Sequence, residues 1–126
     1  MKKSNTILTV MVACFLSACC GLLFSACEKS ESEVRSELIG TWTHETDNFK
    51  DVLVLTEDEK FSFTCHILRY NGKGNYRYEH KGNGQIVSWL ILDYDQKEAA
   101  KLEVQNISGS ELDLVDRYGN SFKFRK

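Results

Sequence analysis

Between residues 41 and 125 the chain alternates short runs of strand-forming residues with clusters of turn residues. In the clearest run, Phe61, Phe63 and Cys65 alternate with polar residues, and this period of two is typical of a strand with one buried face. No segment after residue 40 shows the period of an amphipathic helix. The pattern therefore restricts this part of the chain to an all-β domain.

The strand-forming runs number eight, and the connections between them are short. Residues 71–74 and 82–84 have the composition of turns, and Gly82-Asn83-Gly84 is a strong signal for a tight hairpin. Short connections make neighbours in sequence antiparallel neighbours in the sheet, and closing the sheet removes its exposed edges. We therefore predict a small eight-stranded antiparallel up-and-down barrel, with strands at 41–44, 52–55, 61–67, 76–78, 85–92, 101–107, 111–116 and 121–125.

A short helical turn is predicted before the first strand, at residues 34–39, with Ser32 as its cap and Val34 and Leu38 on one side. The run 86–92 is apolar on both faces, which indicates a strand covered from outside as well as from inside the barrel. We expect the helical turn to provide this cover over Trp89, with a partner protein as the alternative.

The first 26 residues have the organisation of an export signal. Lys2 and Lys3 precede an uncharged stretch at 7–26, which ends in small residues directly before Cys27. The sequence Leu-Phe-Ser-Ala-Cys at 23–27 resembles the lipobox of bacterial lipoproteins, in which the cysteine sulfur receives diacylglycerol and a peptidase cuts before it. Leu-Ser-Ala-Cys ending at Cys19 is a competing site. An uncleaved membrane-spanning helix is the further alternative.

Cleavage before Cys27 is favoured because a polar run follows at once and suits a tether. The segment 27–35 is therefore predicted to be a lipidated acidic tether, and 36–126 the barrel domain. The acid-rich start of the tether resembles the segments that follow the lipidated cysteine of surface-displayed lipoproteins in Bacteroidetes. The resemblance implies palmitate-type acyl chains that hold the protein on the outer membrane of a Gram-negative bacterium, exposed at the cell surface.

Charge and cysteine content exclude several classes of function. Because Lys2 and Lys3 are the charged residues of the first 26, residues 27–126 carry 14 Lys+Arg against 18 Asp+Glu. A mildly acidic domain repels phosphate backbones, so nucleic acid is not expected as a partner. Once Cys27 is a thioether, Cys65 has no intrachain partner, which excludes a disulfide framework and a thiolate cluster. Because Cys65 alternates with Phe61 and Phe63, it is predicted to be a small core residue.

Gly40-Thr41-Trp42 after a short helical turn resembles the opening of the lipocalin family, in which the Trp closes one end of an eight-stranded barrel. The compact lipocalin-like domains of Bacteroidetes lipoproteins are a closer likeness, and it covers residues 36–126. The likeness also rests on Phe61-Ser62-Phe63, Gly74-Asn75-Tyr76, the 107–114 segment and Phe122-Lys123-Phe124. The chain is shorter than a full lipocalin and lacks the C-terminal helix, so an ample ligand cup does not carry over.

The candidate ligand and barrel-end residues are aromatic: Trp42, Tyr76, Tyr78 and Trp89. The five tyrosines, which include Tyr70, Tyr94 and Tyr118, cluster near strand ends, where such rings line a ligand mouth or simply pack at a rim. His44, His66 and His80 lack metal-ligand spacing and are expected at the surface or rim. Asp113 and Asp116 or the acids at 57–59 are expected to be solvated, without a buried partner.

No set of residues combines a nucleophile, a base and an orienting group, so we expect no catalytic residue, no metal and no cofactor. The sequence favours a non-enzymatic, membrane-anchored lipocalin-like binding module for a small apolar or amphipathic ligand. The alternative is a protein-interaction or structural module of the cell envelope whose barrel is filled by residues such as Phe61, Phe63, Ile86 and Leu114. A cavity of roughly 300 Å³ or more separates the two hypotheses.

Overall fold

The computed structural model describes residues 29–126, and the compact unit within it runs from Glu31 to Lys126. The predicted export signal at 1–26 and both candidate lipidation residues, Cys27 and Cys19, lie outside the described residues. The lipid anchor therefore stays a prediction, and the barrel domain is described by itself.

The predicted helical turn is an α-helix, α3 (Glu31–Leu38), which begins inside the segment expected to be a tether. Glu31 and Arg35, four residues apart, form an ion pair at 2.6 Å on its exposed side. Val34 and Leu38, also four apart, lie on the adjoining side of the helix and are buried. The Arg35 guanidinium donates to the carbonyl oxygen of Tyr78 at 2.9 Å, so both apolar packing and a hydrogen bond hold the helix on the barrel.

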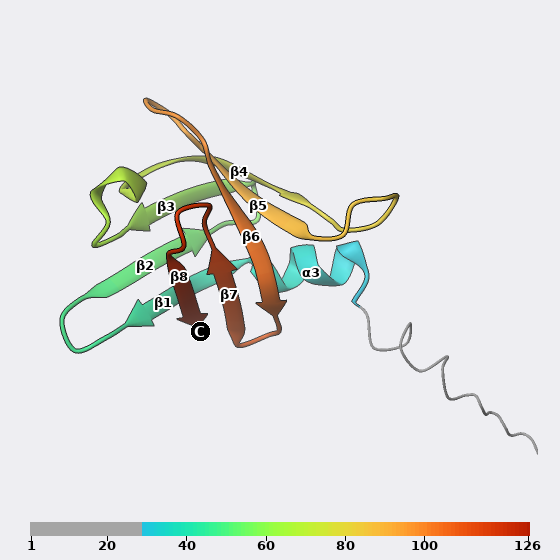
Figure 1. Ribbon diagram of the computed structural model, residues 1–126, viewed down its shortest axis with the longest axis horizontal. Helices are drawn as coiled ribbons and strands as arrows, with labels where there is room; N and C mark the ends of the chain where they lie inside the picture. The colour runs from blue at the N-terminus through green and yellow to red at the C-terminus, as the bar shows by residue number, and fades with distance from the viewer. Residues whose placement is uncertain (1–28) are drawn as a thin grey trace, which may run out of the picture. The chain divides into compact units, whose positions relative to one another are not determined.

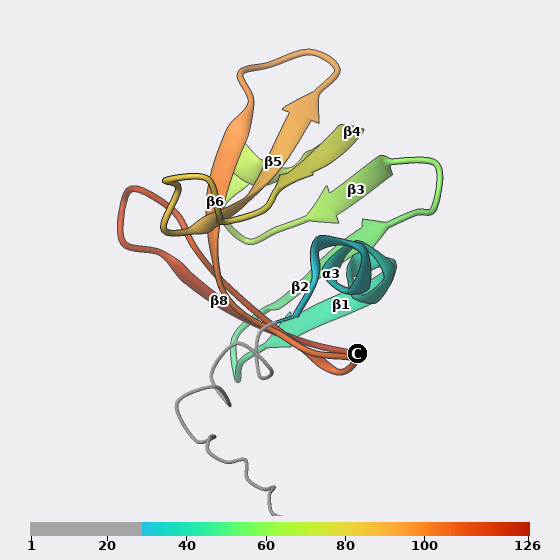
Figure 2. The same cartoon turned by 90° about the vertical axis from the view of Figure 1, so that its right-hand side faces the viewer.

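Eight strands follow, and every one pairs antiparallel with its neighbour in sequence to close a barrel in the order β1 to β8 (Figure 1). This confirms the fold class. The strands are β1 (Gly40–Glu45), β2 (Lys50–Leu55), β3 (Lys60–Thr64), β4 (Gly72–Glu79), β5 (Ser88–Tyr94), β6 (Ala100–Ile107), β7 (Glu111–Val115) and β8 (Ser121–Arg125), with a short 3-10 segment, η1 (Leu68–Tyr70), before β4. Figure 1 and Figure 2 show α3 at one end of the barrel, where β6 is the strand that it approaches most closely.

The turn predicted at 71–74 is wrong, because Gly72 and Gly74 belong to β4. A Cβ on Gly74 would lie 2.0 Å from the backbone oxygen of Asp93 in β5. The glycine is therefore required by close strand approach rather than by a turn. The chain reverses earlier, where the Asn71 side chain accepts from the Cys65 amide at 2.7 Å and donates to its carbonyl at 2.9 Å.

The hairpin between β4 and β5 has the predicted tight turn. Asn83 and Gly84 have φ angles of 51° and 89°, and Gly82 and Gln85 exchange two backbone hydrogen bonds across them. The following strand starts later than predicted, at Ser88, and continues to Tyr94. Ile86, expected in the core, is 87% exposed in the segment between this turn and β5.

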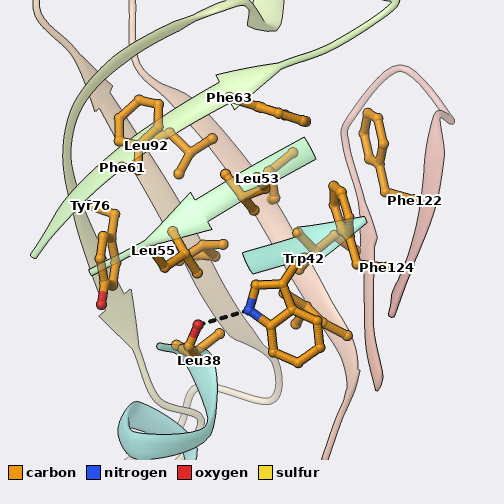
Figure 3. Packing of buried hydrophobic residues seen from close by; sticks show 14 of the residues in the cluster. Leu38, Trp42, Leu53, Leu55, Phe61, Phe63, Tyr76, Leu92, Phe122 and Phe124 are labelled. Carbon is orange, nitrogen blue, oxygen red and sulfur yellow. Dashed lines mark hydrogen bonds between the residues drawn. The ribbon is translucent and has the colours of Figure 1, made fainter. Parts of the chain in front are cut away.

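The barrel interior is filled by side chains from all eight strands (Figure 3). Trp42 is fully buried beside α3, and its indole N–H donates to the carbonyl oxygen of Leu38 at 2.8 Å. Trp42 is thus a core residue, and its role as a plug of one barrel end stays a prediction. Phe63 and Leu114, expected inside, are buried, and Cys65 is a core residue as predicted. Among residues 29–126, the wholly buried apolar side chains are Trp42, Leu53, Leu90, Leu92, Leu102, Leu112, Leu114 and Phe124.

The barrel is closed where β1 meets β8, and this seam is short. Thr43 and Arg125 form the registered pair, and one strand position further the imidazole Nδ1 of His44 accepts from the Lys123 amide at 3.1 Å. His44 therefore replaces a backbone acceptor in the ladder and belongs to the closure of the sheet.

Candidate functional site

The two ends of the barrel differ in what covers them. Because successive strands run in opposite directions, every second loop lies at the same end. One end carries α3 and the loops 56–59, 80–87 and 108–110. The opposite end, called the mouth from here on, is formed by the loops 46–49, 65–71, 95–99 and 116–120.

A cavity of about 330 Å³ lies at the mouth, above the packed interior. Residues from the loops 65–71, 95–99 and 116–120, together with the ends of β5 and β6, line it. The lining combines three tyrosine rings, two alanines, four cations and two acids: Arg69, Tyr70, Tyr94, Lys97, Glu98, Ala99, Ala100, Lys101, Asp116, Arg117 and Tyr118. We call it the mouth cavity.

The inner wall of the mouth cavity is a hydrogen-bonded set of three buried residues. The Tyr94 hydroxyl donates to the backbone oxygen of Tyr70 at 2.5 Å, and the Tyr70 hydroxyl donates to the Asp116 carboxylate. Asp116 also accepts from the backbone and side-chain nitrogens of Asn120, both at 2.8 Å, and from the Tyr118 amide at 2.9 Å. These bonds join the β3–β4, β5–β6 and β7–β8 connections into one wall.

This bonding fixes the charge of Asp116. Burial by itself raises the pKa of a carboxyl group, but the hydrogen bonds from Tyr70 and Asn120 outweigh it and hold the pKa of Asp116 below its ordinary value of 3.8. Burial and the same bond raise the pKa of Tyr70. At neutral pH the wall therefore consists of neutral phenols around a carboxylate whose acceptor sites are occupied by protein donors.

The rim of the mouth cavity is cationic and held in place. The Arg69 guanidinium lies 4.2 Å from the centre of the Tyr118 ring, and Arg117 lies 5.1 Å from the same ring and donates to its hydroxyl at 2.9 Å. Lys97 donates to the backbone oxygens of Asn71 and Arg69, at 2.6 Å and 3.3 Å. Two loops are thereby tied together across the rim.

The arginines around the cavity differ from the other arginines of the described residues in their pairing. Among the described residues, Arg35, Arg77 and Arg125 each form an ion pair with a carboxylate, whereas Arg69 and Arg117 form none. With Lys97 and Lys101, the lining holds two more positive than negative charges, on a chain whose net charge is -2. Unpaired cations beside aromatic faces favour a ligand that is apolar and carries a negative group.

The four aromatic residues singled out by the sequence lie elsewhere. Trp42, Tyr76 and Tyr78 point into the interior toward the α3 end, where Tyr76 donates to the Thr56 carbonyl at 2.8 Å and Tyr78 contacts Ser88 at 3.1 Å. Trp89 lies on the outer face of β5. None of the four lines the mouth cavity, and their contact with a ligand stays a prediction.

The expectation that the helix covers the outer face of β5 is wrong. Val34 and Leu38 of α3 pack into the interior cluster, whereas Ile91, 4% exposed on the outer face, is not part of it. Ile91 is in register with Arg77 and Lys101 on the neighbouring strands. Lys101 also lies 4.5 Å from the Trp89 ring, so long cationic side chains provide the outer cover.

The expectation that Asp116 lacks a buried partner is also wrong, since Tyr70 is that partner. The acids at 57–59 are exposed as expected. Arg69, Lys97 and Arg117 were not predicted from the sequence to be site residues. The feature that could have indicated them is their position in loops: in an up-and-down barrel alternate loops share an end, which brings cations from three distant loops together.

A second polar cluster lies at the same barrel end. Asp51 on β2 is wholly buried, and its carboxylate accepts from the backbone amide of His66 at 2.7 Å and contacts His66 Nδ1 at 2.9 Å. Cys65 is adjacent, and burial raises the pKa of its thiol to about 11. Such a thiol is a poor nucleophile at neutral pH. His80, at the opposite end, contacts the Tyr78 hydroxyl at 2.6 Å.

In the part of the chain that the structure describes, no helix has the length and apolarity needed to cross a bilayer. Comparison of the chain with protein-family models, with curated proteins and with solved structures returns no match. What the geometry establishes is a closed eight-stranded antiparallel barrel, compatible with a lipocalin-like fold and consistent with binding modules.

Proposed function

We propose that this protein is a lipid-anchored, non-enzymatic binding module of the bacterial outer membrane, and that its mouth cavity takes a small amphipathic organic anion. The observation that carries the proposal is the pairing of charges. The two arginines that have no carboxylate partner among the described residues are the two that line the cavity. An anion there gains charge-assisted hydrogen bonds at no cost to an existing ion pair.

The ligand's apolar part has a defined place. The rings of Tyr70, Tyr94 and Tyr118, with Ala99 and Ala100, offer apolar surface next to the cationic rim. A volume of about 330 Å³ is at the lower end for ligand pockets, so the occupant is small. Because the barrel interior is occupied by side chains, we place the ligand above it rather than within a deep cup.

The proposal can be tested with two probes of the same shape and different charge, 2-naphthoate and its neutral analogue 2-naphthamide. The full chain in a non-ionic detergent is titrated with each by calorimetry, and the heat of titration into detergent alone is subtracted. We expect naphthoate to bind more tightly than naphthamide. Arg69→Gln and Arg117→Gln should each weaken naphthoate binding, by about 1.5–3 kcal/mol for a lost bond to a charged group.

Lys123→Gln is the matched control, because this exposed cation on β8 does not line the cavity. Its affinity for naphthoate should equal that of the unaltered chain. If Lys123→Gln lost as much affinity for naphthoate as the arginine variants, the effect would be one of net charge and not of the cavity. Equal affinity for naphthoate and naphthamide would contradict the proposal that the ligand is an anion.

The anchor is tested separately, by labelling cells with an alkyne fatty acid. The unaltered chain should be tagged and Cys27→Ala should not. If Cys27→Ala is still tagged while Cys19→Ala is not, the lipid is on Cys19 and the proposed cleavage site is wrong.

The second candidate function is an interaction or structural module of the cell envelope, and the filled interior favours it. Native mass spectrometry of the full chain, extracted from its own host, separates the two candidates. A co-purifying small molecule that is lost in Arg69→Gln supports binding at the mouth. A bare mass in every preparation supports the interaction module.

A further inference from the structure

Asp51, Cys65 and His66 meet at the mouth although the sequence separates Asp51 from the other two. Asp51 is near the start of β2, and Cys65 and His66 directly follow β3, its antiparallel neighbour. A carboxylate oxygen, the Cys65 sulfur and a ring nitrogen of His66 all lie within 4.8 Å of one another. None of these residues lines the mouth cavity, so the cluster is a separate feature.

The buried carboxylate needs an explanation. The Asp51 side chain is 0% exposed, at a position that points into a barrel otherwise filled with apolar side chains. Buried carboxylates are paired, hydrogen-bonded or bound to metal ions. In the described chain, His66 is the side chain with a nitrogen within ion-pair distance of this carboxylate, at 2.9 Å, and its own side chain is 35% exposed.

We propose that Asp51, Cys65 and His66 form a binding site for a divalent transition metal, with Zn²⁺ as the best match. Thiolate, imidazole and carboxylate are the three side-chain ligands that zinc uses in proteins. On binding, the thiol proton leaves to solvent. The thiolate and carboxylate then neutralise the two charges of the cation, and no net charge is left buried.

The distances fit with modest adjustment. Ligands about 2.0–2.3 Å from a tetrahedral zinc lie about 3.3–3.8 Å from one another. Nitrogen and oxygen, at 2.9 Å here, would move apart by about 0.4 Å, and the sulfur, within 4.8 Å of both, would approach them by about 1.3 Å at most. Three protein ligands leave a fourth coordination position. Water could reach it from the side of His66, whose side chain is partly exposed.

The surroundings hold the ligands as outer contacts do in metal sites. Asn71 bonds both backbone groups of Cys65, which fixes the turn that carries the sulfur. The Ile67 amide donates to the Cys65 sulfur at 3.4 Å, a contact that favours a thiolate. The Phe49 ring stacks on the His66 ring at a centroid distance of 3.6 Å and limits its rotation.

The test is a titration of the full chain with Co²⁺, which reports its own ligands, followed by competition with Zn²⁺. We expect one tetrahedral Co²⁺ per chain, with a thiolate-to-cobalt charge-transfer absorption that Zn²⁺ abolishes. Cys65→Ser should lose that absorption. His66→Gln should weaken the affinity for Zn²⁺ at least about 10-fold. His80→Gln is the matched control and should bind as the unaltered chain does.

Two results overturn the proposal. If the unaltered chain, folded by near-ultraviolet circular dichroism, binds neither cation, then the three residues form only a hydrogen-bonded clamp. If the charge-transfer absorption persists in Cys65→Ser, the thiolate comes from the N-terminal cysteines that both chains share, and the site is not at the mouth. The first result is measured on the unaltered chain, so the proposal can be refuted even if a variant misfolds.

Discussion

Removal of one oxygen atom, in Tyr70→Phe, should destabilise the domain by about 1.5–3 kcal/mol at neutral pH, the usual contribution of a hydrogen bond to a charged group. The Tyr70 hydroxyl is buried, and it donates to the Asp116 carboxylate. Phenylalanine keeps the ring packed against Phe63 and Phe122. Asp116 retains its donors from Asn120 and Tyr118, so the loss is that of one bond and not of the whole wall.

The effect should depend on pH in a defined direction. The pKa of Asp116 in the fold lies below its ordinary value of 3.8. The stabilisation is therefore fully present above that ordinary value and is lost as the pH falls through the folded pKa. The difference in unfolding free energy between the unaltered chain and Tyr70→Phe should accordingly be large at neutral pH and shrink as the pH falls below 3.8 and through the folded pKa of Asp116.

Urea unfolding of the full chain in detergent, followed by tryptophan fluorescence, measures these differences. Tyr118→Phe is the matched control. This tyrosine is exposed, so loss of its hydroxyl should change the unfolding free energy by less than about 0.5 kcal/mol. Two results would refute the assigned role of the Tyr70–Asp116 hydrogen bond. One is a loss of unfolding free energy in Tyr70→Phe that stays the same at acid pH, and the other is an equal loss in Tyr118→Phe.

Three further substitutions test the fold. Trp42→Ala should cost about 3–5 kcal/mol in urea unfolding, because it empties a fully buried site and leaves the Leu38 carbonyl without its donor. Gly74→Ala should lower the unfolding free energy by at least about 1–3 kcal/mol, because the new Cβ meets the backbone oxygen of Asp93. Weakened pairing of β4 with β5 would show as reduced amide protection in these two strands. Ile86→Ala, in the exposed connection before β5, should change the unfolding free energy by less than about 0.5 kcal/mol, and a larger loss would contradict its placement.

The barrel could be predicted from sequence because its determinants are local. Alternation at Phe61 and Phe63 sets which face is buried, and short connections set the order of strands. The errors lie where a tertiary contact decides. Gly74 has the composition of a turn residue, but it is a strand position that another backbone approaches. Ile86 is apolar, yet it lies between the tight turn and the start of β5, where its side chain is exposed.

The candidate site was less accessible to sequence reasoning because its contacts are non-local. Tyr70 and Asp116 are 46 positions apart, and the bond between them turns an acid expected in solvent into a buried wall residue. The lack of a carboxylate partner at Arg69 and Arg117 is a property of the folded arrangement. The tyrosines were recognised as a set, but only the alternation of loops divides them between the two barrel ends.

The most direct measurement of the central claim is a map of where an amphipathic anion binds. The isotopically labelled full chain in detergent is titrated with 2-naphthoate while backbone amide resonances are followed. We predict saturable shifts concentrated at residues 69–70, 94–101 and 116–118, which surround the mouth cavity. Shifts concentrated instead at α3, or on the outer face around Trp89, or no saturable shift at any concentration, would contradict the claim that the mouth is the binding site.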